Sequence, residues 1–227
     1  MCNTISEISM IVDLSMTIAD HLRWSVDRRL KGDFADGNPF QVTYVGWAVH
    51  GFTHVDAPRH MVPDGPTTSD LSLDKIVGSA AVVDLTGIAP ESEISAEQLQ
   101  VAGAHIQHND IVVMKTAWDT VESPQTAEFW TRAPYMSREA AQWLLSKQIR
   151  AIAFDFPQDY PIRKLLVDHV DPITEFVTHD VLLRNNVTLI EYICNTASIT
   201  KDRVDFYALP LKILDSDGAP ARVIAIQ

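Results

Sequence analysis

The chain has 227 residues, of which 46% are hydrophobic and 21% charged, as in an ordinary globular protein with a substantial core. Its formal net charge of -12 argues against nucleic-acid or anionic-membrane partners, because those surfaces require clustered Lys and Arg side chains. No uncharged apolar stretch approaches the ~18 residues of a membrane helix, and Glu7 and Asp13 interrupt the region where a signal peptide would be apolar.

The cysteine content indicates a reducing compartment. Cys2 and Cys194 have neither metal-binding nor redox spacing, and a single pair in a chain of this size predicts reduced thiols. We therefore expect a cytoplasmic protein that forms one domain over residues 1–227.

The first part of the chain predicts a strand followed by a long loop. Apolar residues favour a strand over residues 8–14, whereas residues 15–39 lack periodicity. Long loops of this kind often carry function, so Trp24 and Phe34 are candidates for contact with a flat substrate. The alternative is that both rings pin the loop to the body of the protein.

Residues 41–50 predict a strand that leads into a cluster of ionisable side chains. His50, His54 and His60 lie within eleven residues of one another, together with Asp56. When buried, such groups need a shared partner, and one divalent cation would satisfy most of them. The alternative is a set of surface histidines, or of core histidines held by hydrogen bonds.

The spacing within this cluster favours a metal site. Residues two apart in an extended segment project to the same side, so His54 and Asp56 can reach one ion, and His50 can join from the preceding turn. Pro58 disfavours helical geometry at the residue before it and keeps the segment extended. His60 falls slightly outside this group, where an imidazole could shuttle protons near neutral pH.

Caps, turns and apolar runs predict the elements in the middle of the chain. They are a turn at 63–66, a short helix over 73–77, a strand over 80–85, a helix capped by Ser95 that ends at Gly103 in the left-handed conformation, a strand over 110–115, a helix from Ser137 to Gln148 and a buried strand over 151–156. This alternation indicates a mixed α/β layer structure.

A second group of candidate ligands lies near residue 180. Thr178 is expected to cap a helix over 179–184, and residues 187–193 predict a strand on which Glu191 shares a face with apolar neighbours. A carboxylate in such a setting needs a basic side chain or a metal as partner, and the nearby His179 favours a metal.

The remaining histidines are weaker candidates. His169 and Asp171 form a competing pair in a loop-like context, without a carboxylate on an apolar strand face. The other three are expected on the surface: His21, His105 and His108.

The residues from His50 to His60 resemble the H-x-G-T-H-x-D-x-P-x-H signature of the metal-dependent cyclase-like hydrolases. This family includes bacterial kynurenine formamidase and isatin hydrolase. Asp13-Leu14-Ser15, Asp64-Gly65 and the segment from His179 through Glu191 to Asn195 are similar to further motifs of the family. The chain departs from the pattern at Phe52, where relatives carry glycine, and at Asp155-Phe156-Pro157-Gln158, where relatives often carry a serine after the aspartate.

The resemblance implies a swivelling β/β/α-type domain with a mixed sheet, a small-molecule substrate, and assembly as a homodimer or homotetramer. It implies one or two ions of Zn²⁺ or Mn²⁺. His50, His54 and Asp56 would hold the first position, and Asp56 would bridge to a second position with His179 and Glu191. His60 would be the catalytic acid/base, and Phe52 would join Trp24 and Phe34 at the substrate.

These residues lead to the hypothesis that metal-bound hydroxide hydrolyses an amide, cyclic amide or lactone, as in an arylformamidase or isatin hydrolase. A non-haem iron oxygenase using His54, Asp56 and His179 is one alternative. A non-catalytic metal-binding module, in which the ion only holds the fold together, is the other.

Overall fold

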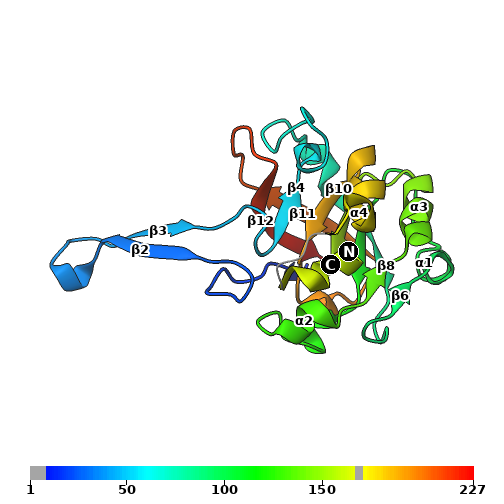
Figure 1. Ribbon diagram of the computed structural model, residues 1–227, viewed down its shortest axis with the longest axis horizontal. Coiled ribbons are helices and arrows are strands. Elements are labelled where there is room, and N and C mark those ends of the chain that lie inside the picture. The colour runs from blue at the N-terminus through cyan, green and yellow to red at the C-terminus, as the bar shows by residue number, and fades with distance from the viewer. Residues whose placement is uncertain (1–8, 167–170) are drawn as a thin grey trace, which may run out of the picture.

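The computed structural model describes residues 9–166 and 171–227. It consists of a rounded body and a long hairpin that projects from one side of the body (Figure 1). The predicted competing ligand His169 lies outside the described residues. Its neighbour Asp171 pairs with Lys164 at 3.0 Å.

The body is built on a closed mixed sheet. Among the described residues, eight strands form this sheet: β1 (Ile11–Asp13), β4 (His54–Asp56), β5 (Val77–Asp84), β7 (Ile111–Lys115), β9 (Ala151–Phe154), β10 (Thr188–Glu191), β11 (Arg203–Pro210) and β12 (Gly218–Ile226). Their order is β1-β12-β11-β5-β7-β9-β10-β4, and a further pairing of β12 with β4 closes the sheet into a barrel. Strands β5, β7, β9 and β10 run parallel, whereas β4, β11 and β12 pair antiparallel.

The parallel strands are apolar on both faces because each face packs against a different core. On β5, Ala80 and Val82 point into the barrel, whereas Ala81 and Val83 point outward to the helices. Strands β7 and β9 alternate in the same way. This arrangement explains why these segments read as continuous apolar runs rather than as alternating ones.

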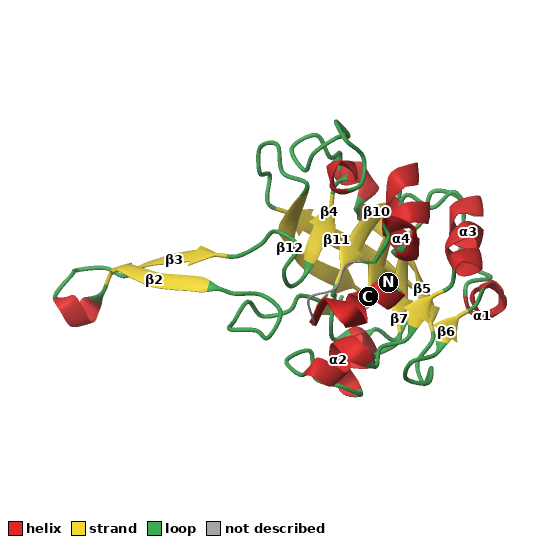
Figure 2. Cartoon of the chain, in the orientation of Figure 1, coloured by secondary structure: helices red, strands yellow, loops and turns green. Residues whose placement is uncertain are grey.

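The helices α1 (Ala96–Ala102), α2 (Ala127–Thr131), α3 (Arg138–Ser146) and α4 (Val177–Val181) cover the outer face of the barrel. Helices α1 and α3 lie on the side away from the projecting hairpin, whereas α2 lies closer to its base (Figure 2). A small sheet of β6 (Glu93–Ile94) and β8 (Tyr135–Met136) lies beside them. Ser95 and Ser137 cap α1 and α3 as predicted, and the capping box at Ser95 is complete. No helix in the described part of the chain is long and apolar enough to cross a bilayer.

The projecting hairpin, which we call the arm, corrects the prediction for residues 15–50. Its strands are β2 (Asp27–Gly32) and β3 (Val42–Gly46), which pair with each other rather than with the barrel. The expected patternless loop therefore contains a strand, and the expected strand over 41–50 ends before His50, which lies in a turn. The pattern was missed because every residue of β2 before Gly32 is exposed, so apolar and polar positions do not alternate.

Three local predictions were wrong. Gly103 has φ -101° and is not left-handed; a Cβ there would lie 2.8 Å from Ile106 and from the Leu99 carbonyl, so space explains the glycine. Thr178 lies inside α4 and does not cap it. His21, expected on the surface, is partly buried, and its ring stacks on Trp24 at 4.5 Å.

One buried carboxylate joins the loops that follow three barrel strands. Asp155, after β9, accepts hydrogen bonds from the Thr116 backbone N–H (2.9 Å) and hydroxyl (2.6 Å), both after β7. It also accepts from the Ala117 N–H (2.7 Å) and from the Thr196 hydroxyl beyond β10. All of these donors lose their partner if the carboxylate is removed.

We therefore predict that Asp155→Ala lowers the free energy of unfolding by about 2–4 kcal/mol, since several buried donors are left without an acceptor. Urea denaturation monitored by circular dichroism measures the change. The exposed Asp202→Ala variant is the control and should stay within about 0.5 kcal/mol of the parent. Equal stabilities of the two variants would contradict the role given to Asp155.

Candidate metal centre and active site

The predicted ligands meet on the outer face of the barrel. Val55 of β4 points into the barrel interior, so its neighbours His54 and Asp56 point outward. Glu191 of β10 is paired in register with His54 and lies beside it. Helix α4 lies next to these two strands (Figure 1) and supplies His179. Two distant parts of the chain therefore form one site.

His54 has a ring nitrogen that needs a cation. Its Nδ1 lies 2.8 Å from the Phe52 carbonyl, so Nδ1 carries the proton and donates it to that oxygen. The lone pair on Nε2 then faces Asp56 Oδ1 at 3.2 Å and Glu191 Oε2 at 3.5 Å, both of which are acceptors. Among the described residues, His54 Nε2 and Asp56 Oδ2 are buried and have no hydrogen-bond partner. A divalent cation fits this arrangement, because it would satisfy all of these atoms.

His179 is arranged in the same way from the other side. Its Nδ1 lies 2.6 Å from Asp159 Oδ2, which leaves Nε2 facing Glu191 Oε1 at 3.2 Å and Asp56 Oδ2 at 3.5 Å. Asp159 is held in turn by the Thr178 N–H (2.7 Å) and hydroxyl (2.9 Å). A carboxylate behind an imidazole fixes the tautomer and orientation that a metal ligand needs.

His50 approaches Asp56 from the turn before β4. Its Nδ1 lies 2.8 Å from Asp56 Oδ1, and its Nε2 lies 2.8 Å from Asp217 Oδ2. Gly218 makes room for this ring, because a Cβ at that position would lie 2.7 Å from His50. Asp56 therefore presents Oδ1 to His50 and His54, and Oδ2 to His179.

His60 stands at the mouth of the cluster. Its ring centre lies 4.0 Å from that of His50 and 5.5 Å from that of His179, and its Nδ1 lies 3.5 Å from Asp217 Oδ2. The side chain is 32% exposed, so solvent reaches the cluster here. His60, His50 and Asp56 also have ligand atoms close enough to share an ion.

These contacts and the burial of the cluster shift the pKa values of His50, Asp56 and His60. Burial lowers the pKa of His50, but hydrogen bonds with Asp56 and Asp217 outweigh burial and raise the pKa to about 9. Burial raises the pKa of Asp56, but the surrounding imidazoles hold it well below its usual range. His60 differs, since burial lowers its pKa and keeps the ring neutral near pH 7.

An aromatic wall lies beside the cluster, formed by His21, Trp24, Trp130 and Tyr192. Tyr192 follows Glu191 and its ring centre lies 5.4 Å from that of His54. Trp24 packs on Trp130 at 5.2 Å and on Tyr192 at 5.7 Å, and it is only partly buried. The wall therefore offers ring surface next to the predicted ligands.

The structure places the three predicted substrate contacts in different surroundings. Trp24 belongs to the aromatic wall. Phe52 lies behind it, 1% exposed, with its ring 4.9 Å from Trp24 and its backbone in the left-handed region at φ 61°. Phe34 lies in the short turn of helix at the tip of the arm, which projects away from the body (Figure 1).

The sequence analysis missed three polar partners of the cluster. Asp159 and Asp217 hold His179 and His50, and the buried Gln158 side chain donates its amide N–H to Glu191 Oε1. Of these three residues, only Asp217 was marked in the sequence. The glycine that follows it, Gly218, indicates that another group lies close to the backbone there. Of the histidines expected on the surface, His108 is exposed and His105 is partly buried.

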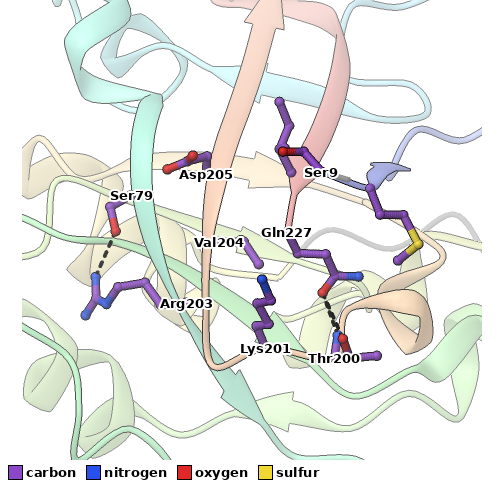
Figure 3. Close-up of a pocket in the computed structure, with 10 residues that line it drawn as sticks. Ser9, Ser79, Thr200, Lys201, Arg203, Val204, Asp205 and Gln227 are labelled. Carbon is purple, nitrogen blue, oxygen red and sulfur yellow. Dashed lines mark hydrogen bonds between the residues drawn. The ribbon is translucent and has the colours of Figure 1, made fainter. Parts of the chain in front are cut away.

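A hollow of about 720 Å³ lies elsewhere, at the ends of β11 and β12 (Figure 3). Of its two basic side chains, Lys201 and Arg203, the second pairs with Asp110 at 2.9 Å and donates to the Ser79 hydroxyl at 3.2 Å. None of the ten residues that line this hollow belongs to the histidine cluster, so we do not assign the reaction to it.

Comparison with known proteins gives concordant results. The family model described as putative cyclase matches residues 12–158. The kynurenine formamidase of Erythrobacter litoralis is 25% identical over 189 residues, which cover 83% of this chain and 78% of that protein.

Two solved structures have the same fold. The structure of a potential metal-dependent hydrolase with cyclase activity has a TM-score of 0.73 at 26% identity and covers 96% of this chain and 98% of its own. Isatin hydrolase A from Ralstonia solanacearum has a TM-score of 0.78 at 20% identity, covering 96% and 92%. The predicted mixed-sheet α/β fold is thereby confirmed.

The contact between Asp159 and His179 yields a prediction. Asp159→Asn should weaken binding of a divalent cation by about 10–100-fold, because the imidazole loses the carboxylate that orients it. Titration of metal-free protein with Zn²⁺ against a competing chelator measures the affinity. Asp180→Asn is the matched control, since Asp180 is the next residue after His179 and pairs with Arg138 and Arg184 instead. Unchanged affinity in the Asp159 variant would refute the orienting role.

Proposed function

The chain belongs to the putative cyclase family, and on that premise we propose that it is a metal-dependent hydrolase that cleaves C–N amide bonds, including cyclic amides. One observation carries the proposal. The buried imidazoles of His54 and His179 converge with the carboxylates of Asp56 and Glu191, and His54 Nε2 and Asp56 Oδ2 have no hydrogen-bond partner among the described residues.

A divalent cation held by this cluster would lower the pKa of a water molecule and polarise the substrate carbonyl. The donor set supports two positions that share Asp56, because Oδ1 faces His50 and His54 while Oδ2 faces His179 near Glu191. Mixed histidine and carboxylate donors suit Zn²⁺ or Mn²⁺.

His60 is the proposed acid/base of the reaction. Burial lowers the pKa of its imidazole, so the ring is neutral near pH 7 and can accept the proton released when water attacks the carbonyl. Asp217, 3.5 Å from Nδ1, stabilises the imidazolium that results. The His60 imidazolium then returns the proton to the leaving amine.

The aromatic wall supports an aryl amide as substrate. Flat rings stack well on Trp24, which lies beside Tyr192 and hence beside the predicted ligand His54. Kynurenine formamidase and isatin hydrolase are the relatives whose names imply such a substrate, and N-formylkynurenine and isatin are therefore the first compounds to test, followed by enol lactones.

Several broader features belong to the same proposal. Residues 1–227 would form a single catalytic domain, and copies of the chain would assemble as a homodimer or homotetramer. A cytoplasmic location is supported by Cys194, the free thiol in the described residues.

The two alternative functions, an iron oxygenase and a non-catalytic metal-binding module, leave some residues of the cluster without a role. An oxygenase centred on His54, Asp56 and His179 leaves His50 and Glu191 without a role, although both lie against Asp56 or His54. A purely structural ion does not require the solvent-exposed His60 at the mouth of the site.

The acid/base role is tested with His60→Ala. We expect kcat for amide hydrolysis to fall by about 10²–10⁴-fold while metal content, measured by plasma mass spectrometry, stays unchanged. The exposed His108→Ala variant is the control and should keep both. Loss of the metal together with activity would make His60 a ligand instead, and full activity would remove it from the mechanism.

A further inference from the structure

Arg23 is a cation without an acidic partner beside the aromatic wall. Its side chain is partly buried, and the guanidinium carbon lies 4.4 Å from the ring centre of Trp130 and 5.6 Å from that of Trp24. Its Nη1 donates to the Ile162 carbonyl at 3.3 Å. In the part of the chain that the structure describes, no carboxylate pairs with this guanidinium, although the protein has 30 acidic residues. The charge of Arg23 is therefore available to a ligand.

The backbone at Arg23 is held in place by His21. The Nδ1 atom of His21 accepts a hydrogen bond from the Arg23 N–H at 3.1 Å, so Nε2 carries the proton and donates to the Pro124 carbonyl at 2.9 Å. The indole N–H of Trp130 donates to the same carbonyl at 3.0 Å. Arg23 and the ring over which it lies thus share one anchor, which fixes the position of the guanidinium before any ligand arrives.

The guanidinium has hydrogen-bond donors to spare. It is planar with several N–H groups along its edge, and the Ile162 carbonyl accepts from only one of its nitrogens. The remaining N–H groups can form the paired hydrogen bonds that a planar carboxylate accepts. Arg23 is therefore suited to bind a carboxylate.

The aromatic wall connects Arg23 to the predicted metal ligands. The ring of Trp130 lies 5.1 Å from that of Tyr192, which lies 5.4 Å from that of His54. The guanidinium is thus separated from His54 by two aromatic rings. A flat substrate that lies on this wall with its scissile amide at the cluster would direct its opposite end toward Arg23.

We infer that Arg23 binds a carboxylate on the substrate, at the end remote from the scissile bond. The substrate class is then the anionic aryl amides, in preference to neutral amides of the same shape. In a chain of net charge -12, such a substrate needs a local cation that offsets the long-range repulsion. The identity of the bond that is cleaved rests on the proposed function, whereas the carboxylate site can be measured without turnover.

A matched pair of substrates tests this preference. The compounds para-formamidophenylacetate and its methyl ester have the same amide and ring and differ by one negative charge. Arg23→Gln should lower kcat/KM for the acid by about 10–100-fold, mainly through KM, because a charge-assisted contact made on binding is lost. The kcat/KM for the ester should stay close to that of the wild type.

Two further variants separate recognition of charge from support of the wall. Arg23→Lys keeps the charge and should restore part of the preference for the acid over the ester. Lys147→Gln removes a cation that lies 4.9 Å from the ring centre of Trp143, outside the wall, and should leave the kinetics on both substrates unchanged. Equal losses on the acid and the ester in Arg23→Gln would show that Arg23 only supports the wall and would refute the inference. A wild-type enzyme without preference for the acid would also refute it.

Calorimetric titration with para-aminophenylacetate measures carboxylate binding without turnover. This compound is the expected product, since hydrolysis of the formamide releases it together with formate. With metal-loaded protein, we expect its Kd to rise about tenfold in Arg23→Gln, and an unchanged Kd would refute the carboxylate site. If the wild-type protein hydrolyses neither substrate while Kd still depends on Arg23, the proposed function fails and the carboxylate site stands.

Discussion

The site depends on one register, the pairing of Glu191 with His54 between β10 and β4. Because side chains alternate along a strand, this register places His54, Asp56 and Glu191 together on the outer face of the barrel, with Val55 inside. A slip of one residue would turn the charged groups into the apolar interior. The carboxylate of Asp56 is then shared among three imidazoles, each of which orients a lone pair or a proton toward it. The fold thus brings imidazoles and carboxylates together in an arrangement that suits a divalent cation.

Much of this centre was predictable from local spacing. His54 and Asp56 are two residues apart in an extended segment, and that spacing alone puts both on one side. Glu191 was predictable as a ligand because it is a carboxylate on an otherwise apolar strand. Strands β5, β7 and β9 and the capped helices α1 and α3 were also predictable, because buried strands and helix caps leave strong local patterns.

The remainder depends on contacts between distant residues. Asp159 and Asp217 meet His179 and His50 only after the barrel closes, and the sequence around Asp159 carries no sign of such a role. The arm was not predicted because its strands make few contacts with the rest of the chain. Both faces of its strands meet solvent within one chain, so its sequence shows none of the alternation that burial against a core imposes.

Phe52 has an implication for how this fold varies its substrates. At φ 61° its backbone is in a conformation that costs a residue with a side chain about 1–2 kcal/mol and costs glycine little, which explains why the cyclase-like signature carries glycine there. The main chain at this point is fixed by the carbonyl that orients His54. The side chain is therefore free to vary. The Phe52 ring packs against Trp24 of the aromatic wall at 4.9 Å, and a glycine here would remove that contact while keeping the carbonyl that orients His54.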